Sequence, residues 1–424
     1  GITVETKKDV QQILEELNQE AKNLLAKKVI FHERIIRIRN IAGAEGVYIT
    51  DSEAKTIDQT AKRVLNGISA GESQEKIFHV PLENWLCEGL ICQGRLNLLV
   101  SLQKVGKSSF VAGLLNQWKY DKSEFLGCKF DQKVPPTIIV GTDQYSSDWV
   151  NIFEPVGLMA RDKQGCCQLL DPIKKLWHLE NAIHLDEAGI ELITNEAENL
   201  SIKYEQPPLI VVDSLNSVCQ GLGIDEFKPE SKEPIQALIE SVSHVGATTL
   251  LLHHASKSRS HERASNASRG SNAIPALASQ IILLDWLTEN RTDHRVTLTT
   301  QGRNGKPLDL VIEQESRSRW ISHGSSRDIQ RKLQLDKLET KLNEKQSTAL
   351  GLVRTRWENY PSQKTDSTDL AQAMPEEYGW DKDEKNAIGK ARSTLDQLTK
   401  KGFLFCKTKY IDGRGNVNQY QPDI

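Results

Sequence analysis

Residues 101–109 carry a short run of residue types that could bind a phosphate group. The stretch reads SLQKVGKSS and follows the apolar run LNLLV. Gly106, Lys107 and Ser108 match the end of the phosphate-loop pattern G-x-x-x-x-G-K-[ST], while Ser101 stands where the first glycine is usual. In such a loop, backbone N–H groups cradle a phosphate at a helix N-terminus, the lysine reaches the outer phosphates and the hydroxyl ligates Mg²⁺. The residues predicted to bind nucleotide are Ser101, Lys104, Val105, Gly106, Lys107, Ser108 and Ser109.

Two carboxylates follow apolar runs and could complete this site. PPLIVVDS at 207–214 contains Asp213, which could hold a magnesium-bound water opposite Ser108. TIIVGTD at 137–143 ends in Asp143, which could act on the attacking water as a base. Acids at strand ends also serve only as caps, and Asp148 is a second candidate for the base. Loop and acids together predict an NTPase that uses ATP and Mg²⁺, against the alternative of a chance Gly-Lys-Ser turn.

The elements that must position these residues alternate between short apolar runs and helical patterns. The apolar runs lie at 96–100, 137–141, 209–213, 248–253, 281–285, 296–300 and 308–312. Continuous apolar residues are typical of strands buried on both faces of a mostly parallel sheet. We therefore predict that residues 76–323 form an α/β domain.

The segments on either side of this domain have a different character. In residues 1–75, leucine and isoleucine recur at helical spacing, and a helix should begin at the capping box of Thr50 and Glu53 and stop at Gly67. We expect this helical region to be an interaction or collar domain. Residues 324–342 are polar and charged and are predicted to form a helical linker.

Residues 343–424 are predicted to form a separate small domain. Helices are expected over about 344–358, after Asp366, and over about 382–401, followed by two strands around the turn at 412–415. Helices followed by a β-hairpin resemble a winged helix-turn-helix. Lys390 and Arg392 on its third helix could contact DNA, although winged helices also serve protein contacts.

Composition sets limits on the whole chain. With 38% hydrophobic and 26% charged residues among 424, it is an ordinary soluble composition, and its apolar runs are too short to span a bilayer. The net charge of −3 argues against a uniformly basic nucleic-acid coat but allows local basic loops. Seven cysteines without a CxxC pair favour a reducing, cytoplasmic compartment and no structural zinc. The chain starts with glycine, so we expect a trimmed start.

The order of these motifs resembles a known family. The strand with GKS, the strand with Asp143, VVDSL at 211–215 and the strand ending in two histidines resemble the RecA-type ATPase core, closest to the RepA-like and DnaB-like hexameric helicases. WLCEGLICQGRLNLLV at 85–100 is similar to the usual entry to that core. The resemblance covers roughly residues 78–322. It implies a RecA-like sheet with flanking helices and assembly into a ring, which is a hexamer in that family.

The resemblance also implies further roles. LLLHHASK at 250–257 is similar to the family's sensor strand, which makes His254 the γ-phosphate sensor; otherwise one histidine packs in the core and the other caps the strand. QGRNGKP at 301–307 is similar to the K-x-R-x-G segment, which makes Arg303 an arginine finger for a neighbouring subunit. Ser101, Asp143 and Gln301 depart from the family's Gly, Glu and Lys, which leaves room for a slow, switch-like ATPase.

The segment after His254 is the predicted contact with single-stranded DNA. Residues 256–273 are rich in Ser, Asn, Lys and Arg and have almost no apolar residue, so they suit either a disordered surface loop or a channel-facing loop. The basic residues expected to grip DNA are Lys257, Arg259, Arg263 and Arg269, the last of them in the R-G-S element.

The prediction from sequence is therefore an ATP-dependent DNA helicase of the plasmid or phage replication type, working as a hexameric ring on single-stranded DNA. The trimmed start leaves room for a primase or another replication protein as partner. Two alternatives remain open: a RecA-type DNA-binding ATPase that does not unwind, such as a recombination or transposition regulator, and a DNA-binding scaffold without enzymatic activity.

Overall fold

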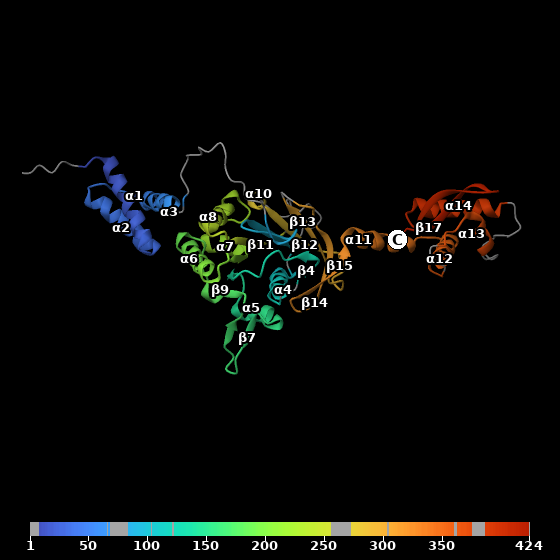
Figure 1. Ribbon diagram of the computed structural model, residues 1–424, viewed down its shortest axis with the longest axis horizontal. Helices are drawn as coiled ribbons and strands as arrows, with labels where there is room; N and C mark the ends of the chain where they lie inside the picture. The colour runs from blue at the N-terminus through green and yellow to red at the C-terminus, as the bar shows by residue number, and fades with distance from the viewer. Residues whose placement is uncertain are drawn as a thin grey trace, which may run out of the picture. The chain divides into compact units, whose positions relative to one another are not determined.

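The computed structural model describes residues 8–65, 67, 84–102, 104–120, 123–255, 273–302, 305–359, 363–374 and 386–423 (Figure 1). The chain divides into two compact units, residues 1–324 and 325–424. Among the described residues, no helix is long and apolar enough to cross a membrane.

A nine-stranded sheet, counted over the described residues, forms the centre of the first unit. Its order is β15-β14-β13-β12-β3-β11-β10-β6-β9. The strands are β3 (Leu96–Ser101), β6 (Thr137–Val140), β9 (Ile173–Trp177), β10 (Leu209–Asp213), β11 (Thr248–His254), β12 (Gln280–Trp286), β13 (Arg295–Gly302), β14 (Asp309–Ser316) and β15 (Arg319–Ser325). The strands from β12 to β9 in this order are parallel, whereas β13 is antiparallel to both β12 and β14. This parallel-dominated sheet fits a RecA-like α/β fold.

Each apolar run that the sequence singled out is a strand of this sheet, so that prediction is confirmed. The two edge strands β9 and β15 were missed. β9 reads IKKLW and β15 reads RWISHGS, so polar residues interrupt the apolar pattern on which the prediction depended.

Helices cover both faces of the sheet. They are α4 (Lys107–Lys119), α5 (Ser146–Phe153), α6 (Glu187–Tyr204), α7 (Leu215–Leu222), α8 (Lys232–Val242) and α10 (Ala273–Leu277), with short 3₁₀ turns at Glu154–Val156, Leu179–Asn181, Pro229–Ser231 and Ser243–Val245. In β3, Leu99 packs with α4 and α5 on one face, while Leu98 and Val100 pack with α6, α7 and α8 on the other. The sheet is therefore the middle layer of three, which explains its continuous apolar strands.

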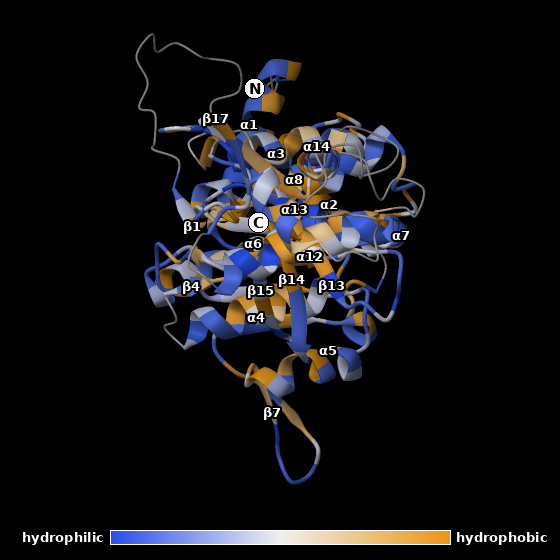
Figure 2. Ribbon diagram, turned by 90° about the vertical axis from the view of Figure 1, so that its right-hand side faces the viewer, coloured by the Kyte–Doolittle hydropathy of each residue, from blue (hydrophilic) through white to orange (hydrophobic). Residues whose placement is uncertain are grey.

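In the described part of this unit, three small hairpins lie outside the nine-stranded sheet. They are β1 (Trp85–Cys87) with β2 (Ile91–Cys92), β4 (Glu124–Phe125) with β5 (Cys128–Lys129), and β7 (Met159–Arg161) with β8 (Cys167–Leu169). The β7–β8 hairpin extends away from the body of its unit (Figure 1), and its turn reads DKQG and is drawn hydrophilic in Figure 2. Asn97 ties the first hairpin to β3, because its amide bonds both the N–H and the C=O of Cys92 at 2.7 and 2.9 Å.

The N-terminal region is a bundle of three helices within the described residues: α1 (Val10–Ala26), α2 (Phe31–Ala44) and α3 (Asp51–Leu65). The bundle has its own apolar cluster, which includes Leu17, Ile38 and Ala54. The predicted capping box is confirmed, since Thr50 and Glu53 exchange hydrogen bonds at the start of α3. The sequence reading did not separate α2 as a helix of its own.

The second unit contains α11 (Ser326–Glu339), α12 (Glu344–Asn359), α13 (Ser367–Ala373), α14 (Ala387–Lys400) and the hairpin β16 (Leu404–Ile411) with β17 (Gly415–Pro422). A bridge joins Thr365, just before α13, to Tyr420 of β17. Leu350, Leu395 and Tyr420 are buried in a core that belongs to this unit alone. α12, α13 and the hairpin thus lie where the sequence predicted them. α14 begins at Ala387, and the start predicted at about residue 382 lies outside the described residues.

Candidate active site

The phosphate loop lies at the C-terminal ends of the parallel strands. β3 leads into the loop, and α4 starts at Lys107. Gly106 has φ 101°, in the left-handed region where a side chain would be strained, so this position requires glycine. The first turn of α4 has backbone N–H groups without helical partners, and these suit an anion at this edge.

Ser101 is the last residue of β3 and is fully buried, with 0% of its surface exposed. Its hydroxyl donates to the carbonyl of Leu102 at 3.0 Å. Because Ser101 keeps strand pairing with His254 on one side and Leu284 on the other, its backbone needs no glycine. The structure places this side chain in the sheet rather than in the loop, whereas Lys104 lies exposed in the loop.

A carboxylate, a hydroxyl and an amide meet directly beside the loop. Ser108 Oγ donates to Asp213 Oδ2 at 2.6 Å. Gln144 Nε2 donates to Ser108 Oγ at 2.7 Å and to Asp213 Oδ2 at 3.1 Å. Asp213 is only 2% exposed, and this burial raises the pKa of its carboxyl group. The predicted metal residues Ser108 and Asp213 are thus brought together, and Gln144 joins them.

A second set of contacts joins the lysine of the loop to β11. Lys107 Nζ lies 2.7 Å from His254 Nδ1, and His254 Nε2 lies 3.7 Å from Asp143 Oδ2. The backbone N–H of Asp143 also donates to the carbonyl of Asp213 at 3.2 Å, which fixes the two strand ends against each other. Lys107, Asp143 and His254 therefore lie within one small volume.

The protonation of this group follows from its surroundings. Burial lowers the pKa of Lys107 to about 8, against the opposing pull of Asp213 and Asp143. The contact with His254 lowers the pKa of Asp143, although partial burial acts in the other direction. Asp143 is therefore ionised at neutral pH. An ionised carboxylate of lowered pKa can orient water but is a weak base.

The adjacent histidine has a different role. His253 is 1% exposed, and burial lowers its pKa to about 4, so it is a neutral core residue. His254, at the end of the same strand, turns to Lys107 instead. Neighbours with opposite side-chain directions are what a strand dictates.

Glu226 is a further acid of the site that the sequence reading missed. It follows α7, and its charge interacts with those of His254 and Asp143. Among the described residues its Oε2 is shielded from solvent and has no hydrogen-bond partner, and burial raises the pKa of this carboxyl. No local motif marks this residue, whereas Gln144 could have been suspected from its place directly after Asp143.

Trp320 of β15 supports the phosphate-loop helix from outside. Its indole N–H donates to the carbonyl of Ser109 at 3.1 Å, and its ring packs edge-on against Phe110. Gly113 makes this approach possible, because a Cβ there would lie 2.6 Å from Trp320 Cδ1. The edge strand β15 thus fixes α4, and with it Lys107 and Ser108.

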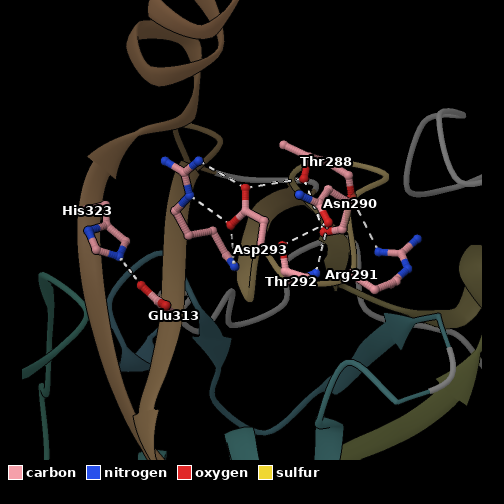
Figure 3. A network of polar contacts seen from close by, with 8 residues as sticks. Thr288, Asn290, Arg291, Thr292, Asp293, Glu313 and His323 are labelled. Carbon is pink, nitrogen blue, oxygen red and sulfur yellow. Dashed lines mark hydrogen bonds and ion pairs between the residues drawn. The ribbon is translucent and has the colours of Figure 1, made fainter.

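A polar network closes the turn from β12 to β13 (Figure 3). β12 is parallel to β3, so this turn and the phosphate loop both follow C-terminal ends of parallel strands. Arg295 Nε and Nη2 donate to the two carboxylate oxygens of Asp293, each at 2.9 Å, which lowers the pKa of Asp293 to about 2. Thr288 donates to the same carboxylate, and Asn290 accepts from Thr292. His323 and Glu313 form a separate pair on the neighbouring strands. The donors and acceptors of the turn satisfy one another, so its evident role is to hold the turn in one shape.

Several predicted residues lie outside the described part of the chain. These are the proposed arginine finger Arg303 and the proposed DNA contacts Lys257, Arg259, Arg263 and Arg269. Lys390 and Arg392 are described and lie exposed on α14, in the second unit. The cluster around Lys107 belongs to the first unit.

The comparisons with known proteins bear on the core. Residues 74–260 match the model of an AAA domain family, AAA_25, which is less than half of the chain. Among solved structures, a KaiC-like protein from the hyperthermophilic archaeon Pyrococcus horikoshii OT3 aligns with 56% of this chain and 93% of its own, at 15% identity and a TM-score of 0.37. The comparison with curated proteins gives no match.

The side chains beside the loop fit a magnesium ion held with a nucleotide. Ser108 and Asp213 present oxygen donors 2.6 Å apart, and oxygen is the ligand that Mg²⁺ prefers. Bound there, Mg²⁺ would neutralise charge on the phosphate oxygens. The AAA domain match, the phosphate loop and this oxygen pair together support one conclusion: residues 74–260 carry the core of a nucleotide-hydrolysing P-loop ATPase.

Proposed function

We propose that the protein is an ATP-dependent DNA helicase of the replication type, which assembles into a hexameric ring around single-stranded DNA. The observation that carries the proposal is the position of His254. Its ring contacts Lys107 at 2.7 Å, and only Ala255 separates it from the basic segment 256–272. A change at the γ-phosphate would therefore reach the proposed DNA contacts through a single strand end.

The residues of the site would divide the work as follows. Lys107 leaves His254 and compensates the charge of the phosphates, while Ser108 and Asp213 would hold the magnesium ion. Asp143, kept ionised by its surroundings, orients the attacking water. His254, released by Lys107, can then turn toward Asp143, which lies 3.7 Å away, and this movement pulls on the following segment.

A ring is supported by the position of the strand that leads to Arg303. Gly302 pairs with Gln280, and Gln280 pairs with Asn97 near the start of β3. The phosphate loop begins after Ser101, four residues further along β3, which is about 13 Å at the rise of a strand. The described part of β13 thus ends, at Gly302, at the opposite end of the strands from the phosphate loop, which favours action of the proposed arginine finger on a neighbouring copy.

DNA contact by the second unit is supported by the surface of α14. Its sequence AIGKARSTLDQLTK has one acid, Asp396, which accepts a hydrogen bond from Tyr420 at 2.5 Å. Lys390 and Arg392 are both exposed on this helix, which in a winged helix can face a phosphate backbone. Arg414 on the hairpin bonds Asp366 at 3.2 Å and is already engaged within the unit.

The first test is the rate of ATP hydrolysis with and without single-stranded DNA, with Lys107→Ala as the blank. Strong stimulation followed by strand separation in an unwinding assay is the expected result. Stimulation without unwinding would favour the regulator that binds DNA but does not unwind it. No hydrolysis above the blank would favour a scaffold and overturn the proposal.

Action across a subunit interface has its own test. Arg303→Ala should bind nucleotide but not turn it over, and mixing it with Asp143→Ala should restore part of the activity, because mixed rings contain some intact composite sites. If no ratio of the two variants restores hydrolysis, Arg303 does not act on a neighbour.

A further inference from the structure

Gln144 makes two hydrogen bonds that no phosphate-loop motif requires. Its Nε2 donates to Ser108 Oγ at 2.7 Å and to Asp213 Oδ2 at 3.1 Å, while Ser108 Oγ itself donates to the same Asp213 oxygen at 2.6 Å. The three side chains come from the loop after β6, from the start of α4 and from the end of β10. This triangle is therefore a junction of three elements at the point where a magnesium ion would lie.

The direction of these hydrogen bonds is determined by chemistry. Ser108 has one hydroxyl proton, and it is used toward Asp213, so Ser108 Oγ can only accept from Gln144. Asp213 Oδ2 accepts from Ser108 and from Gln144 alike. The NH₂ group of Gln144, and not its carbonyl oxygen, must therefore face both partners, so the amide orientation is not arbitrary.

Both bonds of Gln144 are compatible with magnesium bound with a nucleotide. Ser108 Oγ gives its proton to Asp213 and one lone pair to Gln144, so its second lone pair remains for the cation. Asp213, which in the proposed function holds a magnesium-bound water, has other lone pairs, so its bond from Gln144 can remain. A carboxylate that is held by a neighbouring donor keeps one orientation, and such support from outside the ligand set is a known requirement of metal sites.

We infer that Gln144 is a positioning residue for the magnesium site, which holds the side chains of Ser108 and Asp213 in the orientation that the metal needs. The inference rests on the proposed nucleotide site and adds a residue that the phosphate-loop motif does not contain. Gln144 governs how nucleotide binding depends on Mg²⁺, and not nucleotide binding as such.

The experiment measures the affinity of a fluorescent, slowly hydrolysed ATP analogue as a function of Mg²⁺ concentration and again in EDTA. The variants are Gln144→Met, which conserves volume but removes the donors, and Gln164→Met in the exposed turn of the β7–β8 hairpin as the matched control. Gln144→Met should require roughly 10- to 100-fold more Mg²⁺ for the same gain in affinity, the usual cost of losing such support. Its affinity in EDTA, its melting temperature without nucleotide and every property of Gln164→Met should stay unchanged.

Each other outcome has a definite meaning. If Gln144→Met shows the same Mg²⁺ dependence as the wild type, or loses affinity equally in Mg²⁺ and in EDTA, the inference is wrong and the proposed function still stands. If the wild type itself binds no analogue under any condition, the nucleotide site and the proposed function fail. A higher Mg²⁺ requirement together with a lower melting temperature would assign Gln144 to local packing and would also overturn the inference.

Discussion

Lys107 serves two environments, and its protonation differs between them. In the protein without nucleotide it is 6% exposed and contacts His254, and burial lowers its pKa to about 8. Phosphates at the loop would add negative charge around the same ammonium group and favour its charged form. Nucleotide binding should therefore be linked to the uptake of a proton by this residue.

We expect nucleotide affinity to fall as the pH rises through about 8, because the lysine must then be recharged on binding. The measurement is the dissociation constant of an ATP analogue between about pH 7 and pH 9.5, with Lys107→Arg as the control, since arginine stays charged throughout. The same lowered pKa affects the free energy of unfolding in the opposite direction from the nucleotide affinity. The folded pKa lies below the unfolded value of 10.5, so this group adds to the free energy of unfolding as the pH rises from about 8 to 10.5. An affinity that does not change with pH in the wild type would contradict the linkage.

Some residues of the site can be identified from the sequence, and others cannot. Gly106, Lys107 and Ser108 are adjacent, so a local motif reveals them. His254 meets Lys107 across 147 positions, and only the resemblance to a family suggested its role. Glu226 and Gln144 carry no motif at all, and their proximity to the site depends on how the loops after α7 and β6 fold back. Side-chain proximity of this kind is a property of the tertiary structure and not of spacing.

At the scale of elements, the position of α4 depends on one close contact with the edge strand β15. A Cβ at Gly113 would lie 2.6 Å from Trp320 Cδ1 and 3.0 Å from the carbonyl oxygen of Ser318. We expect Gly113→Ala to lower the free energy of unfolding by about 1–3 kcal/mol, because Trp320 must move away from the helix. Urea denaturation measures the change.

The matched control for this substitution is Gly351→Ala in α12, where nothing lies within 4 Å of the added Cβ. Alanine favours a helix over glycine, so this variant should be stabilised by up to about 1 kcal/mol. Equal effects of the two substitutions would mean that Trp320 does not restrict α4. This contact could not be predicted from the sequence, because the polar residues of β15 interrupt the apolar pattern by which a strand is recognised.

The N-terminal bundle is joined to α6 by a buried charged group. Arg34 is 1% exposed, its Nε and Nη2 donate to Asp58 of α3 at 2.7 and 2.8 Å, and its Nη1 donates to Glu191 of α6 at 2.7 Å. Arg34→Met would leave Asp58 buried without its cation, an imbalance that typically costs about 3–5 kcal/mol. We expect hydrogen exchange in α2 and α3 to accelerate in this variant.

The sheet provides the internal reference for that experiment. Exchange in β3, β10 and β11 should stay slow in Arg34→Met, because those strands lie in a separate apolar core from the bundle. Arg37→Met, which removes an exposed pair with Glu33 on the same helix, should change neither region. Acceleration throughout the chain would show instead that the bundle and the sheet unfold as one cooperative unit.

At the scale of the whole molecule, nucleotide chemistry and the proposed DNA contact of α14 are in different units. The site around Lys107 lies in residues 1–324, and Lys390 and Arg392 lie in residues 325–424, which have a core of their own. The sequence indicated this separation through the polar stretch before the last helices. A substitution that affects only α14 should therefore leave the basal chemistry intact.

We expect Lys390→Ala combined with Arg392→Ala to weaken DNA binding and to lower the slope of log affinity against log salt by about 2, since each lost phosphate contact lowers the slope by about one. ATP hydrolysis without DNA should be unchanged, while stimulation should require more DNA. The control is Lys332→Ala with Lys337→Ala, which removes the same amount of charge from exposed positions of α11 in the same unit. An identical loss in the control would mean that DNA responds only to the net charge of the unit. An unchanged slope in the α14 variant would mean that this helix does not contact DNA, and its exposed side would then be free for a protein partner.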